Sequence, residues 1–111
     1  MGESRRRKAA NEAVFREVNE RIEGLQRDFA ATHDQQLLLV CECDRIECTE
    51  RLSVSPEIYE RVRGNAACFF VLLGHEDPSV EDVVDTGGDY LIVRKRPGEA
   101  RDLAVETDPR S

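Results

Sequence analysis

The sequence predicts a small α+β protein in which a long N-terminal helix covers a small antiparallel sheet, with a short second helix and a structural zinc site. Three observations predict this fold: an apolar stripe with helical spacing near the N-terminus, several apolar runs of strand length, and three closely spaced cysteines followed later by a histidine. The chain has 111 residues, of which 40% are hydrophobic, so it fits one domain with a modest core.

The first helix is expected from about Ala9 to Ala31. Apolar residues recur there at steps of three and four, which places them on one helical face. They are Phe15, Val18, Ile22, Leu25 and Phe29. We expect this stripe to pack on the sheet, because the apolar strands need a cover and no other helix is long enough. The spacing also fits two heptads, and an exposed stripe would instead mark a surface for a second copy or another protein.

The strands are expected in five short runs. These runs cover residues 37–43, 51–54, 68–73, 80–84 and 90–93. The last two runs flank Gly87 and Gly88 and are typical of a hairpin. Between the second and third runs, Ser55 as N-cap and Pro56 at the first helical position begin a short helix, which Gly64 ends.

Both ends of the chain are expected to lie outside this body. Residues 1–8 carry four bases and one acid and are predicted to form a basic flexible arm. Residues 9–97 form the single zinc-stabilised domain. Residues 98–111 are predicted to be a largely flexible tail with one weak helical turn around Leu103.

The cysteine spacing predicts a metal site. Cys41 and Cys43 are two residues apart at the end of the first strand, so their side chains point to the same face. A polar turn can return Cys48 to them, and tetrahedral zinc needs sulfurs roughly 3.7 Å apart. For the fourth ligand we expect His75, in the turn after the third strand. Cys68 competes with it, but it lies inside an apolar run, where a free cysteine usually behaves as a small hydrophobe.

The expected cofactor is therefore one Zn²⁺ per chain, bound by Cys41, Cys43, Cys48 and His75. Two alternatives stay open for these cysteines: they could be redox-active or disulfide-forming thiols, or inert thiols. Four protein ligands leave no open coordination position, so the pattern favours a structural site over metal catalysis.

Three segments together resemble a group of small uncharacterised actinobacterial proteins. They are residues 15–22, the segment from Cys41 to Glu50 with its C-x-C-x4-C pattern, and residues 70–76 with Gly-His-Glu. The resemblance covers most of residues 11–96. It implies the cysteine and Gly-His-Glu pattern, and it favours His75 over Cys68 as fourth ligand. Asp44 stands where that group often has glycine, which changes the expected turn.

Charge and composition narrow the partners. The net charge is −7, and the bases are concentrated in residues 1–8, so nucleic-acid binding by the acidic body is not expected. The longest apolar runs are far too short to cross a membrane. No secretory segment precedes the cysteines, so a reducing cytoplasm is the expected location.

The expected function is a non-catalytic, zinc-binding module for protein interaction or regulation, since no catalytic triad order, phosphate loop or dinucleotide fingerprint is present. The alternative is a thiol sensor that releases zinc on oxidation. Glu42, Asp44 and Glu47 lie among the cysteines and are expected to raise thiol pKa values, which ranks the sensor second. The partner is expected to be another protein. A monomer is expected, with a homodimer through the first helix as the alternative.

Overall fold

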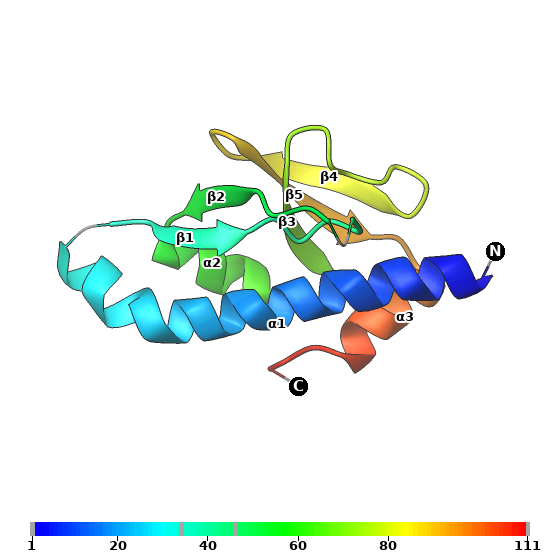
Figure 1. The fold of residues 1–111 in the computed structure, drawn as a ribbon, viewed down its shortest axis with the longest axis horizontal. Helices are drawn as coiled ribbons and strands as arrows, with labels where there is room; N and C mark the ends of the chain where they lie inside the picture. The colour runs from blue at the N-terminus through cyan, green and yellow to red at the C-terminus, as the bar shows by residue number, and fades with distance from the viewer. Residues whose placement is uncertain (1, 34, 46, 111) are drawn as a thin grey trace.

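One helix runs along the whole molecule and the other elements lie against it (Figure 1). The computed structural model describes the backbone of residues 2–33, 35–45 and 47–110, and the side chains of residues 8–29, 35–45 and 47–110. Helix α1 (Gly2–His33) is longer than expected at both ends, and it follows the longest dimension of the molecule, which is 46 Å. The side chains of the predicted basic arm before Lys8 lie outside the described residues.

The strands form two small antiparallel sheets. The first pairs β1 (Leu37–Val40) with β2 (Arg51–Val54). The second has the order β3-β5-β4, made of β3 (Cys68–Leu72), β5 (Tyr90–Lys95) and β4 (Glu81–Thr86). The sheets meet just after β1, where the Glu42 N–H donates to the Phe70 carbonyl at 2.8 Å. The predicted α+β class with a long covering helix is confirmed, with two sheets in place of one.

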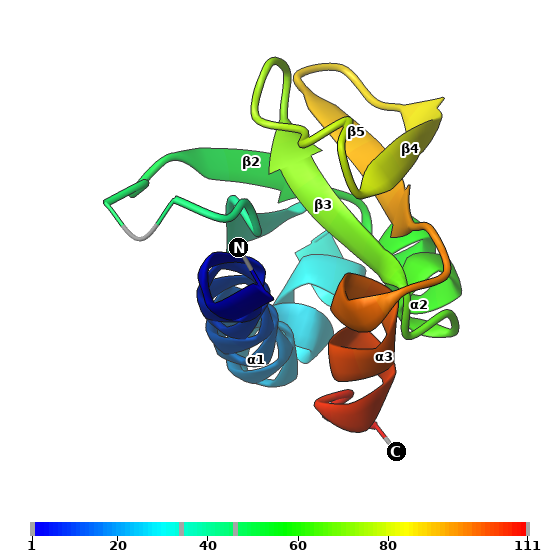
Figure 2. The ribbon, with the colours of Figure 1, turned by 90° about the vertical axis from the view of Figure 1, so that its right-hand side faces the viewer.

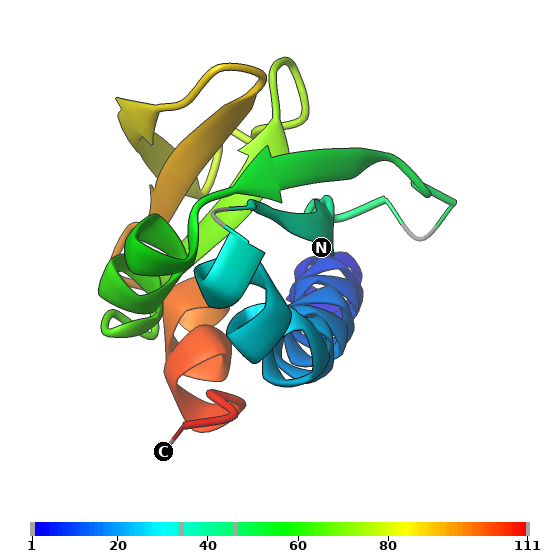
Figure 3. The same cartoon turned by 90° about the vertical axis from the view of Figure 1, so that its left-hand side faces the viewer.

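The short helices lie with α1 on one side of the strands (Figures 2 and 3). Helix α2 (Pro56–Arg63) begins and ends as predicted: the Ser55 side chain accepts a hydrogen bond from the Ile58 N–H, and Gly64 is the C-cap. Helix α3 (Glu99–Glu106) has two turns and buries Ala104, where the sequence predicted one weak turn. No helix of the described chain is both long and apolar enough to cross a membrane.

The hydrophobic core lies between the sheets and α2. Its largest members are the aromatic rings of Tyr59, Phe69 and Phe70, with Leu39 and Leu52 from the first sheet. Tyr59 and Phe70 stack at 5.7 Å between ring centroids. Because this core draws on both sheets, it fixes their relative placement.

The face that α1 turns to this body is polar, and here the prediction was wrong. Among the α1 side chains that the structure describes, residues 8–29, five are buried, at steps of three and four. They are Ala9, Glu12, Arg16, Asn19 and Glu23. The predicted stripe is largely outside: Leu25 is 86% exposed and Phe29 is 56% exposed, whereas Ile22 is only partly buried.

Buried backbone groups explain this choice of face. Asn19 binds the free edge of β1 in both directions: its Nδ2 donates to the Val40 carbonyl and its Oδ1 accepts from the Val40 N–H, both at 2.8 Å. Arg16 donates to the Ala66 and Ala104 carbonyls, each at 2.6 Å. Backbone groups withdrawn from water need such partners, and an apolar stripe supplies none.

A buried lysine completes the polar contact of α1. Lys95 of β5 lies between the Glu12 carboxylate, at 2.6 Å, and the Glu81 carboxylate, and all three side chains are buried. Burial raises the pKa of Glu12 to about 7, although the positive charge of Lys95 opposes this rise. The contact between α1 and the second sheet is therefore an ion cluster with two acids and one base.

Candidate metal centre

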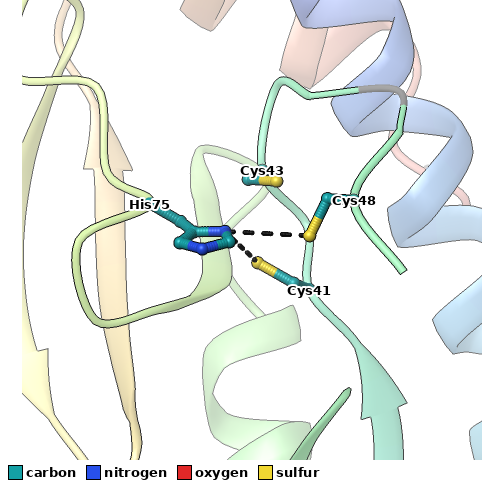
Figure 4. Close-up of side chains that lie close together, drawn as sticks. All are labelled: Cys41, Cys43, Cys48 and His75. Carbon is teal, nitrogen blue, oxygen red and sulfur yellow. Dashed lines mark hydrogen bonds between the residues drawn. The ribbon is translucent and has the colours of Figure 1, made fainter. Parts of the chain in front are cut away.

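Four side chains from two loops converge at one end of the sheets (Figure 4). Cys41 and Cys43 follow β1, Cys48 lies shortly before β2, and His75 lies in the turn after β3. The turn is closed by the His75 N–H, which donates to the Leu72 carbonyl at 2.9 Å. The structure thus brings together all four residues that the sequence predicted as ligands.

The spacing of the four ligand atoms is close to that of a tetrahedral site. One ligand atom from each residue can be chosen so that all four lie within 4.8 Å of one another. The His75 Nδ1 atom is 3.6 Å from the Cys41 sulfur and 3.7 Å from the Cys48 sulfur. Zinc with bonds of about 2.3 Å to sulfur and 2.0 Å to nitrogen requires a nitrogen–sulfur separation of about 3.6 Å. The Nδ1 atom of His75 is therefore the atom placed to bind.

Burial differs among the four ligands. Cys41 and Cys43 are each 1% exposed, whereas Cys48 and His75 are partly exposed. Three sulfurs and one imidazole nitrogen form a donor set that suits zinc, because borderline-soft zinc is bound well by thiolate and imidazole. Within the described part of the chain, this is the one group of histidine, cysteine and acidic side chains close enough to hold a metal ion.

Backbone N–H groups face each thiol. The Leu72 N–H donates to the Cys41 sulfur at 3.3 Å. The Arg45 N–H, two residues after Cys43, donates a hydrogen bond that helps to lower the pKa of Cys43. The Glu50 N–H, two residues after Cys48, donates a hydrogen bond that opposes the rise in the pKa of Cys48 caused by burial. Such donors stabilise thiolates and orient them, so the loop is shaped to hold negatively charged sulfur.

The two buried thiols, Cys41 and Cys43, are hydrogen-bonded to each other. The hydrogen bond from Cys41 lowers the pKa of Cys43 to about 5, and the same bond together with burial raises the pKa of Cys41. Burial also raises the pKa of Cys48. Binding of a cation would displace the protons of these thiols, so metal affinity should fall at low pH.

The residue between the two buried cysteines anchors them. Glu42 is fully buried, two residues beyond the end of β1, and its side chain contacts α1, α2 and β3. Its carboxylate accepts hydrogen bonds from Arg63, at 2.7 Å to both oxygens, and from Asn19 at 2.7 Å.

A backbone group also binds this carboxylate. The Phe70 N–H donates to Glu42 at 3.0 Å, while the Glu42 N–H donates to the Phe70 carbonyl. Glu42 therefore ties the cysteine-containing segment after β1 to β3 and α2, and through Asn19 to α1. Because its backbone is held on both sides, the adjacent cysteines are held as well.

The predicted effect of the acidic neighbours on the thiols is not what the structure shows. Glu42 points away from the sulfurs and is neutralised by Arg63, whose own pKa is raised by this carboxylate despite burial. Asp44 lies 3.7 Å from the ammonium of Lys8, and Glu47 is exposed. The causes that dominate the thiol pKa values are the neighbouring thiols and burial.

Cys68 lies outside the cluster. It is 7% exposed and belongs to the hydrophobic core, as the sequence predicted. Burial raises the pKa of its thiol, as expected for a cysteine that acts as a small hydrophobe.

Glu42 was not predicted from the sequence as an anchor of the cluster. Its position between two cysteines of the predicted first strand, residues 37–43, was the available signal, because alternation in a strand would place it on the opposite, core-facing side. In the structure the strand ends earlier, at Val40.

Fold and site together define a small α+β protein with a Cys₃His cluster that could hold a metal ion. Comparison with protein families, with curated proteins and with solved structures found no match to this chain.

Proposed function

We propose that this chain is a non-catalytic, zinc-binding module that takes part in protein interaction or regulation. The observation that carries the proposal is the convergence of Cys41, Cys43, Cys48 and His75, with all four ligand atoms within 4.8 Å of one another. Four protein ligands complete a tetrahedral zinc shell, and a complete shell stabilises a fold without activating water.

The position of the cluster supports a structural role. Between β1 and β2, the described residues 41–45 and 47–50 have no helix or strand, and they contain three of the four ligands. The fourth ligand, His75, is 27 residues beyond Cys48 and lies in the turn after β3, which belongs to the second sheet. A bound ion would therefore close a long loop and join the two sheets at this end, which supplies stability that such a small core lacks.

Native mass spectrometry of the purified chain tests this proposal. We expect one zinc per chain in the wild type and in Cys68→Ala, which is the matched control because Cys68 is buried outside the cluster. His75→Ala should lose zinc at a chelator concentration that leaves the wild type loaded. A wild type purified from zinc-containing medium without bound metal would contradict the proposal.

A thiol sensor is the second candidate, and the exposure of Cys48 supports it. Cys48 is the one partly exposed cysteine of the cluster, so a peroxide could reach its sulfur. Two ligand thiolates would give two electrons to one hydrogen peroxide and form a disulfide. The peroxide would take up two protons to give two waters, and the zinc would leave. Equimolar peroxide should then release zinc within minutes from the wild type, detected with a zinc-sensitive dye. Zinc that stays bound would reject this candidate.

A further inference from the structure

A polar hollow with three arginines lies at the end of β3 away from the metal cluster. It has a volume of about 330 Å³ and lies between the turn before β3, the end of β5 and the first turn of α3 (Figure 2). The arginines are Arg94, Arg96 and Arg101, and we call this feature the basic hollow. β3 has five residues, so roughly 15 Å of strand separates the basic hollow from His75. Its volume is at the low end of the range for small-molecule sites.

The positive charge of the basic hollow is mostly uncompensated. Among the described residues, Asp82 is the one acid that lines it, and the Asp82 carboxylate already accepts a hydrogen bond from Arg96 at 2.7 Å. Arg94 lies opposite Asp82 in the pairing of β4 with β5. Within the described part of the chain, no carboxylate forms an ion pair with Arg94 or Arg101. Two guanidinium charges are therefore left without an acid, in a chain whose net charge is −7.

Helix stability does not explain the position of Arg101. It lies in the first turn of α3, where the helix dipole disfavours a positive charge. The acids of α3 lie on the other side of the helix and line a separate hollow with Ala10; they are Glu99, Asp102 and Glu106. At 100° per residue, Arg101 is on the side opposite to these acids. α3 thus presents its positive charge to the basic hollow and its negative charges elsewhere.

The rest of the lining is polar and suits an anion. The Asn65 side-chain oxygen accepts a hydrogen bond from the Ala67 N–H at 2.9 Å, which fixes this side chain at the rim. Arg96 is held by two backbone carbonyls as well as by Asp82, so its guanidinium has a fixed position. No aromatic ring is among the described residues of the lining, so a nucleobase would find no stacking surface there.

We propose that the basic hollow binds the phosphate group of a small molecule, with Arg94 and Arg101 as the residues that bind it. The planar guanidinium matches phosphate oxygens with two parallel hydrogen bonds. A phosphate monoester carries nearly two negative charges on one compact group at neutral pH, which matches the two uncompensated arginines. A single carboxylate would bring only one charge. This site is separate from the zinc cluster and goes beyond the function proposed above.

Titration of the zinc-loaded full chain with inorganic phosphate, followed by two-dimensional amide NMR, tests the proposal. We expect the amides of residues 65–67 and 94–101 to shift and to saturate with a dissociation constant below about 1 mM. The amide of Cys43 should stay unchanged. Shifts confined to the cysteine cluster would overturn the proposal, because phosphate would then be binding at the metal. A wild type without saturable shifts up to about 20 mM phosphate would overturn it too.

Variants of the arginines test which residues bind. Arg94→Gln and Arg101→Gln should each weaken phosphate binding about tenfold, because each removes one charge-assisted pair. Arg51→Gln is the matched control: Arg51 is exposed on β2, in the other sheet, and this variant should bind phosphate like the wild type. Equal binding by the wild type and both hollow variants would overturn the proposal.

The acid of the basic hollow gives a test with the opposite sign. Asp82→Asn removes a charge that repels phosphate, so binding should tighten about threefold. Arg96 keeps its place in this variant, because it also donates to the Glu81 and Pro78 carbonyls at 2.9 and 2.5 Å. Weaker binding by Asp82→Asn would overturn the electrostatic argument.

Malonate tests the assignment of the ligand as phosphate. It carries two charges on separate carboxylates, and malonate binding tighter than phosphate binding would overturn the assignment. Zinc content is measured by native mass spectrometry on every sample. A chain that holds one zinc but does not bind phosphate refutes this inference alone, whereas a chain that binds phosphate without zinc refutes only the metal proposal.

Discussion

Replacement of Glu42 by alanine should destabilise this protein more than any substitution of an exposed acid. Its carboxylate is fully buried and is the counter-charge of Arg63, which is 3% exposed. Removal of one member of a buried ion pair typically costs 3–5 kcal/mol, because the other charge stays buried and uncompensated. The Phe70 N–H and the Asn19 amide lose their acceptor too. We expect a loss of about 4 kcal/mol from a total of about 5–15 kcal/mol.

The substitution should also weaken zinc binding. Residues that orient metal ligands from behind typically contribute 10–100-fold to affinity, and Glu42 holds the backbone between Cys41 and Cys43. Urea unfolding of the zinc-loaded and the chelator-treated protein separates the loss of fold stability from the loss of metal affinity. Competition with a chromophoric chelator then measures zinc affinity directly.

Three companion variants keep this prediction testable if Glu42→Ala does not fold. Glu42→Gln retains the shape and one oxygen acceptor but not the charge, and it should lose about half as much stability. Glu47→Gln, an exposed acid of the same loop, should change stability by less than about 0.5 kcal/mol. Adding Arg63→Met to Glu42→Gln should recover stability, because no unpaired charge is then buried. A Glu42→Ala protein within 1 kcal/mol of the wild type would refute the argument.

Three further outcomes follow from the same contacts. A chelator should lower the melting temperature, since the metal closes a loop between sheets, and an unchanged melt after verified zinc removal would show that the core suffices. Asn19→Leu should cost about 2–4 kcal/mol in urea unfolding at low micromolar concentration, because both backbone groups of Val40 lose their partner. Leu25→Glu, on the exposed face of α1, should cost less than about 0.5 kcal/mol. The reverse ranking would show that the apolar face of α1 is the buried one. Burial raises the pKa of Glu12 from 4.5 to about 7, so its ionisation lowers the stability of the wild type as pH rises through that range. Glu12→Gln does not ionise, and its stability relative to the wild type should therefore rise by up to about 3 kcal/mol between pH 5 and 8 in urea unfolding. A stability difference that does not change with pH would show that the ionised form of Glu12 carries no penalty beside Lys95.

Local sequence signals were sufficient where the structure itself is local. The N-cap Ser55, the following proline and Gly64 bound α2 as predicted, because capping needs only residues within one turn. Cys41 and Cys43 enter one cluster as predicted, although β1 ends at Val40 and not at Cys43. His75 could be chosen over Cys68 because a residue in a turn is free to leave the sheet, while one inside an apolar run is not.

The sequence alone determined the helix, the order of the strands and the four residues that converge at the candidate metal centre. Only the tertiary structure decided which face of α1 is buried. Periodicity offered two faces with the same spacing, one apolar and one polar, and apolar burial alone would select the first. The polar face is inside because Asn19 and Arg16 satisfy backbone groups of distant segments, whose need for partners no local pattern reveals. The free energy of burying a polar side chain depends on the partner it meets, and that partner is set by the fold.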